Sequence, residues 1–113
     1  FIGVDGRKTV LLEPSTWSSS EIGAFLEYVE PFEVRETLKT GTWTIVLYRA
    51  DCSHCLATIN ELFSEGSSEV VCVEVPPYSV EKVVPDRFVS ARLSEEREWF
   101  VETPAVIKVD HKI

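Results

Sequence analysis

Two runs of mainly apolar residues stand out along the chain, Trp43–Tyr48 and Val70–Val75. Both runs are rich in β-branched and aromatic residues, which favour strands. They are apolar at nearly every position rather than at alternate positions. Each run therefore predicts a strand that is buried on both faces of a sheet.

Between these runs, apolar residues recur at the spacing of a helix. Cys55, Ile59, Leu62 and Phe63 fall on one helical face, and Gly66 is placed to end the helix. A strand, a helix and a second strand joined by short links predict parallel pairing with a right-handed crossover.

The first 42 residues carry weaker signals. Thr9–Glu13 is a candidate strand that ends at a proline, and Ile22–Val29 has mixed spacing that fits a short helix or an irregular cover. Glu33–Lys39 predicts a helix of about two turns, closed by Gly41.

The C-terminal part predicts two further strands separated by other structure. Tyr78–Arg87 has few periodic features and predicts a loop, and Phe88–Leu93 predicts a strand. Ser94–Glu98 predicts the start of a helix with its serine as the cap. Ala105–Val109 predicts a last strand, and Asp110–Lys112 the tip of a hairpin.

The composition of the chain suits one globular domain. The chain has 113 residues, of which 44% are hydrophobic and 27% charged, and it begins with Phe1, so we expect a processed chain or a piece of a longer one. No stretch approaches the roughly 18 apolar residues of a membrane span. Its net charge of −8, from 11 basic and 19 acidic residues, disfavours nucleic acid and anionic membrane surfaces as partners.

Three cysteines bring chemistry into this picture. An odd number argues against a disulfide scaffold, in which each cysteine is normally paired. Cys52 and Cys55 are three positions apart and form a Cys-x-x-Cys motif, whereas Cys72 stands alone in a β-branched strand. We interpret the first two as a working pair and Cys72 as a buried hydrophobic residue.

The position of the motif Cys52-Ser53-His54-Cys55 gives each part a physical purpose. It follows a buried strand and opens a predicted helix, whose unpaired N–H groups and dipole stabilise a thiolate. Cys52 is then the attacking sulfur and Cys55 the resolving sulfur. His54 favours the thiolate through its charge, whereas Asp51 opposes it.

Two other interpretations of the cysteines remain open. A metal site would need about four ligands, and beyond Cys52 and Cys55 the soft candidates are His54, Cys72 and His111. The alternative is a protein-interaction module whose cysteines never cycle between thiol and disulfide.

The chain resembles the thioredoxin superfamily over residues 43–110. The resemblance is carried by the strand residues Val46-Leu47-Tyr48, the pair Cys52 and Cys55, and Thr103-Pro104 ahead of the last apolar strand. It implies that Pro104 is a cis-proline beside the cysteines and that the backbone at Thr103 binds the substrate chain. A histidine before the second cysteine is similar to disulfide-forming and isomerising members.

Several positions depart from the family pattern. The family usually has tryptophan where Asp51 stands, and many members have a buried carboxylate where Val46 stands. Proton transfer to Cys55 would then need another group, such as Glu74 or water. The usual last strand and helix are missing, so either Thr9–Glu13 fills the sheet edge or those elements lie beyond this chain.

The sequence thus predicts a single α/β domain over residues 1–113, with an extension and first elements at 1–42 and a redox core at 43–110. We expect a thioredoxin-like central mixed sheet of four or five strands flanked by helices. The expected function is disulfide exchange with a protein partner, without metal or organic cofactor. The histidine of the motif favours an extracytoplasmic location, and the segment would be soluble and could be tethered to a membrane or export protein.

Overall fold

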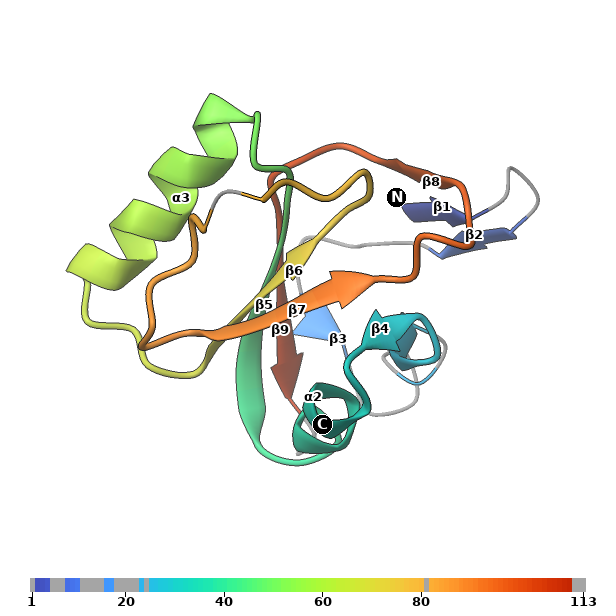
Figure 1. Ribbon diagram of the computed structural model, residues 1–113. Coiled ribbons are helices and arrows are strands. Elements are labelled where there is room, and N and C mark those ends of the chain that lie inside the picture. The colour runs from blue at the N-terminus through green and yellow to red at the C-terminus, as the bar shows by residue number, and fades with distance from the viewer. Residues whose placement is uncertain are drawn as a thin grey trace.

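The computed structural model of the chain describes residues 2–4, 8–10, 16–17, 23, 25–80 and 82–110. In chain order the elements are β1 (Ile2–Val4), β2 (Lys8–Val10), β3 (Thr16–Trp17), β4 (Val29–Glu30), α2 (Phe32–Thr37), β5 (Thr42–Tyr48), α3 (Ser53–Ser64), β6 (Val70–Glu74), β7 (Val89–Leu93), β8 (Trp99–Val101) and β9 (Ala105–Asp110). Strands make up most of the described elements, and the helices α2 and α3 stand on either side of β5 in the chain, as Figure 1 shows.

The main sheet is mixed and contains six strands in the order β3-β9-β5-β6-β7-β4. Strands β5, β6 and β7 are parallel to one another, whereas β9 runs antiparallel to β5. The predicted α/β class and the parallel pairing of the two apolar runs are confirmed. The strand count exceeds the predicted four or five because the edge strands β3 and β4 have two residues each, too few to show a period in the sequence.

The N-terminal part forms a second, small sheet. Strands β2, β1 and β8 are antiparallel neighbours in that order. Thr9 and Val10, the first two of the five residues in the predicted strand Thr9–Glu13, therefore pair with β1 and not with the main sheet, so the suggested place of this strand at the sheet edge is wrong. That edge is taken by β3, which runs parallel to β9. Residues 11–13 lie outside the described residues.

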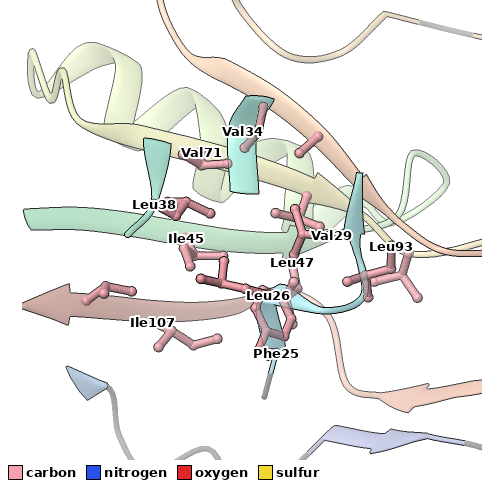
Figure 2. Close-up of a cluster of buried hydrophobic side chains, with 14 of the residues drawn as sticks. Phe25, Leu26, Val29, Val34, Leu38, Ile45, Leu47, Val71, Leu93 and Ile107 are labelled. Atoms are coloured by element: carbon pink, nitrogen blue, oxygen red, sulfur yellow. The ribbon is translucent and has the colours of Figure 1, made fainter. Parts of the chain in front are cut away.

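One face of the main sheet packs against α2 and the segment that precedes β4. Figure 2 shows Phe25 and Leu26 pointing toward side chains of β5 and β9, with Val34 and Leu38 from the α2 segment nearby. Gly23, Phe25 and Leu26 are helical, which fits the first of the two alternatives for Ile22–Val29, a short helix or an irregular cover, whereas Val29 itself belongs to β4. The buried residues of this cluster, called here the α2-side core, are Phe25, Leu26, Val29, Val34, Leu38, Ile45, Leu47, Val71, Val73, Val75, Ala91, Leu93, Trp99, Ile107 and Val109.

The opposite face packs against α3. Of the predicted helical face, Cys55 and Ile59 are fully buried and Leu62 is partly buried. Phe63 is 41% exposed and packs edge-on against Phe88 instead. The buried residues of this cluster, called here the α3-side core, are Val46, Tyr48, Cys55, Ile59, Val70, Cys72, Val84 and Phe88.

The predicted end of α3 at Gly66 is confirmed, because Glu65 is the C-cap and Gly66 follows it. The predicted end of α2 at Gly41 is wrong, because α2 ends at Thr37 with Leu38 as its C-cap, and Gly41 lies in the turn before β5. Gly41 and Gly66 have φ angles of 85° and 80°, a left-handed conformation that only glycine adopts without strain. Neither α2 nor α3 is long and apolar enough to cross a membrane, and the same holds for the rest of the described chain.

The helix predicted to start at Ser94 is wrong. Residues 94–98 form a turn between β7 and β8, in which the Ser94 hydroxyl accepts the backbone N–H of Glu96 at 3.3 Å. The Trp99 indole N–H donates to the Ser94 carbonyl at 2.8 Å. A serine side chain can accept a hydrogen bond from the backbone two residues further on in a turn as well as at a helix start. Ser94 stabilises a turn here and does not cap a helix.

Candidate functional site

The sulfur of Cys52 lies at the start of α3. A turn after β5, closed by the Cys52 N–H donating to the Arg49 carbonyl at 3.1 Å, delivers this residue to the helix. Cys52 is the N-cap, with φ −99° and ψ 108°, and its Sγ accepts the backbone N–H of Cys55 at 3.2 Å. One of the unpaired N–H groups of the first helical turn is therefore aimed at the sulfur, as predicted.

The link between β8 and β9 brings Thr103 and Pro104 to the same place. Strand β9 pairs with β5 in a register that sets Ala105 opposite Leu47, so the residues before Ala105 lie beside the end of β5 (Figure 1). The Sγ of Cys52 lies 3.7 Å from the Thr103 carbonyl oxygen, to which the thiol donates. The peptide bond between Thr103 and Pro104 is cis.

Hydrogen bonds stabilise the negative charge of the Cys52 thiolate. The hydrogen bond with the Cys55 side chain lowers the pKa of the Cys52 thiol, and the N–H groups of Cys55 and His54 and the Thr103 side chain lower it further. Because the thiolate is the nucleophile, these contacts raise the reactive fraction at a given pH.

The pKa values of the other two thiols are raised. Burial raises the pKa of Cys55, and its hydrogen bond to Cys52 adds to that effect. Burial alone raises the pKa of Cys72 to about 12. All three cysteines are free thiols in this structure. The environment thus favours the thiolate form at Cys52 and the thiol form at Cys55 and Cys72.

The remaining predicted residues lie around this centre. Asp51, Ser53 and His54 are exposed on either side of Cys52 in the chain. Val46, which the resemblance to thioredoxins set at the position of a carboxylate in many of them, is fully buried in the same cluster as Cys55. Glu74, suggested as a proton acceptor, accepts the backbone N–H of Ser79 at 2.8 Å.

The metal alternative lacks a ligand set in the described part of the chain. Within residues 25–80 and 82–110 and the shorter described segments, no three His, Cys, Asp or Glu side chains gather closely enough to hold an ion. His111, one of the candidates named from the sequence, lies outside the described residues.

Sequence reasoning missed a hollow beside the cysteine pair. It has a volume of about 390 Å³ and lies between the turn that leads to Cys52 and the loop after β6. No local sequence pattern marks it, because its two walls are about 27 residues apart and meet only through the pairing of β5 with β6. Its lining residues are Arg49, Ala50, Asp51, Pro77, Tyr78 and Ser79.

Comparisons with known proteins add no evidence on function, so the interpretation of this site rests on its geometry. The chain matches no protein-family model, no curated protein and no solved structure.

Proposed function

We propose that this chain exchanges disulfides with protein partners through Cys52 and Cys55. The single observation that carries the proposal is the setting of the Cys52 sulfur, which accepts the Cys55 N–H at 3.2 Å and lies 3.7 Å from the Thr103 carbonyl. A helix start and a cis-proline link thus converge on one partly exposed thiol with a lowered pKa.

The reaction follows from the different surroundings of the two thiols. The Cys52 thiolate attacks one sulfur of a partner disulfide, whose S–S bond breaks and releases a partner thiolate. Cys55 then gives up its proton and attacks the Cys52 sulfur of the mixed disulfide. The second partner thiolate leaves, so the partner disulfide is reduced and Cys52 and Cys55 become joined. The reverse sequence oxidises a partner dithiol.

The arrangement of the central elements supports a thioredoxin-like fold as part of this proposal. Strand β5, helix α3 and strand β6 form a parallel unit, and β9 returns antiparallel on the other side of β5, directly after Pro104. The chain departs from the family in placing β7 parallel beside β6 and in adding the small sheet β2-β1-β8. We therefore propose a variant of the family built around its central elements.

The test is reduction of a protein disulfide, such as those of insulin, by the chain in the presence of dithiothreitol. Replacing the attacking sulfur should abolish the activity, so we expect Cys52→Ser to lose about 1000-fold or more. When dithiothreitol is removed before the substrate is added, reduced Cys55→Ser should accumulate a mixed disulfide with the substrate, visible by mass spectrometry, because the chain lacks its resolving thiol.

Cys72→Ala is the matched control, since it removes a buried cysteine that belongs to β6 and not to the Cys-x-x-Cys motif, and it should keep the activity. If the wild-type chain shows thiols that neither react nor form a disulfide, the exchange proposal is wrong and an interaction module is the better description. Stoichiometric zinc or copper in the purified chain would also contradict it.

A further inference from the structure

The hollow beside the cysteine pair begins one residue before Cys52. One wall is the turn Arg49–Asp51, which runs directly into Cys52, and the other is the loop Pro77–Ser79 after β6. Its volume of about 390 Å³ is ample for one large side chain. A chain held in a disulfide with Cys52 would therefore pass close to this hollow.

Hydrogen bonds hold both walls in place before any partner arrives. The Arg49 Nη1 donates to the Pro76 carbonyl at 2.7 Å and so ties one wall to the start of the other. The Tyr78 hydroxyl donates to the Leu93 carbonyl, and the Ser79 N–H donates to Glu74 at 2.8 Å. A hollow with fixed walls binds at a lower entropic cost than one that must be ordered by its ligand.

The charged residues of the lining indicate that the hollow does not select for a charged side chain of the partner. Arg49 and Asp51 are its charged residues, and they have opposite signs. An acidic or a basic side chain would therefore meet one attractive and one repulsive charge. Net electrostatic selection in either direction is expected to be weak.

The remaining surfaces favour an aromatic side chain. The guanidinium of Arg49 is planar and held by Pro76, and such a group attracts the face of an aromatic ring. The half-buried ring of Tyr78 and the ring of Pro77 offer apolar contact beside it. An aliphatic side chain would gain the apolar contact but not the attraction of the cation for the ring.

We propose that this hollow binds an aromatic side chain that lies next to the cysteine of the disulfide partner. The inference rests on the proposed function and deepens it, because it names a class of preferred substrate. Arg49 and Tyr78 act as specificity-determining residues, and Cys52 carries out the exchange.

The experiment uses short peptides whose single cysteine is joined by a disulfide to thionitrobenzoate. The peptides carry phenylalanine, alanine, lysine or glutamate beside the cysteine, and they react with the reduced Cys55→Ser chain. The Cys52 thiolate bonds to the peptide sulfur, the S–S bond breaks and thionitrobenzoate leaves with the electron pair, so its absorbance reports the rate. We expect the phenylalanine peptide to react about fivefold faster than the alanine peptide.

Two variants test the hollow in different ways. Ala50→Leu fills the space and Tyr78→Ala removes a ring, so each should bring the ratio of phenylalanine to alanine rates toward one. Val80→Ala is the matched control, since Val80 is fully exposed in the same loop and does not line the hollow, and it should leave the ratio unchanged. Circular dichroism of each variant checks that it is folded.

The outcomes separate the two proposals. Equal rates for all peptides, or a fastest reaction with the lysine or glutamate peptide, would overturn the inference while disulfide exchange stands. An undiminished ratio in both Ala50→Leu and Tyr78→Ala would overturn it as well. Release of thionitrobenzoate by none of the peptides would overturn the proposed function itself.

Discussion

The two faces of the main sheet are built from the same strands but have different content. Along β5, Ile45 and Leu47 point into the α2-side core, whereas Val46 and Tyr48 point into the α3-side core. The α2-side core contains no sulfur, while Cys55 and Cys72 are buried in the α3-side core and Cys52 packs at its margin. Alternation along one strand thus separates the stabilising face from the face that carries the thiols.

The three thiols differ in burial within the α3-side core and in pKa. Cys52 is partly exposed at the helix start, where hydrogen bonds lower its pKa, whereas burial raises the pKa of Cys55 and of Cys72. Burial and the hydrogen bonds at one helix start thus give three identical side chains different pKa values. The predictions below test how independent the two faces are.

The largest expected effect comes from opening a cavity on the α2 side. Leu47→Ala should lower the free energy of unfolding by about 3 kcal/mol, because Leu47 is fully buried. Its neighbour Val46 faces the other core, and Val46→Ala should cost about 2 kcal/mol, since fewer methyl groups are lost. Urea unfolding of the reduced protein measures both values.

The same pair of variants sharpens the comparison through thiol reactivity. In the folded protein, Leu47→Ala should leave the rate of Cys52 alkylation unchanged at every pH. Val46→Ala loosens the packing around Cys55, so alkylation of Cys55 should become faster. If Leu47→Ala speeds the alkylation of Cys55 as much as Val46→Ala does, the two faces are not independent.

An intermediate effect is expected in alkaline solution. In the unfolded chain Cys72 loses its proton near its ordinary pKa of 9.0, whereas burial raises the pKa of Cys72 to about 12 in the folded chain. Between these pH values the unfolded state binds fewer protons, so stability falls as the pH rises. The contribution of Cys72 is about 1.4 kcal/mol per pH unit.

This slope is isolated by comparing urea unfolding of the wild type and Cys72→Ala under reducing conditions. The variant has a lower stability at neutral pH because of the cavity, but its stability should fall less steeply above pH 9.0, the ordinary pKa of the thiol. Cys55 titrates in both proteins and cancels in the comparison. Parallel pH dependences would show that Cys72 ionises in the folded chain as easily as in the unfolded chain.

The smallest effect is expected from the exposed charges beside Cys52. Asp51→Asn should speed alkylation of Cys52 at neutral pH and His54→Ala should slow it, each by less than about threefold, because solvent and salt screen exposed charges. Thr103→Val is the comparison, since it removes a hydrogen bond that lowers the pKa of Cys52 and should slow the reaction more. A larger effect from Asp51 or His54 than from Thr103 would contradict this ranking.

Local patterns in the sequence were sufficient for the central elements. The runs around Ile45 and Val71 are long and apolar enough to identify β5 and β6, and the spacing from Cys55 to Ile59 identifies the buried face of α3. The strands of the small sheet have three residues each and show no such period. The pairing of β1 with β8 joins residues about 100 positions apart, such as Ile2 and Val101, which no local pattern can reveal.

In the candidate site, too, the features set by neighbouring residues were predictable and those set by distant residues were not. The helix start at Cys52 could be predicted from neighbouring residues. The contact of Thr103 with Cys52 could not, because 51 residues separate them in the chain, and it was expected only from the family resemblance. The hollow was not expected at all. Its walls are held together by the contact of Arg49 with Pro76, a side chain meeting a loop carbonyl, which depends on the folded geometry.

Cys52 also serves as the cap of α3, and sulfur accepts hydrogen bonds only weakly. Serine, aspartate or asparagine would satisfy the first turn of the helix better. A chain selected for folding alone would be expected to replace the cysteine with one of these residues. The identity of the residue at this position in descendants of this protein should therefore report whether its reactivity is still under selection.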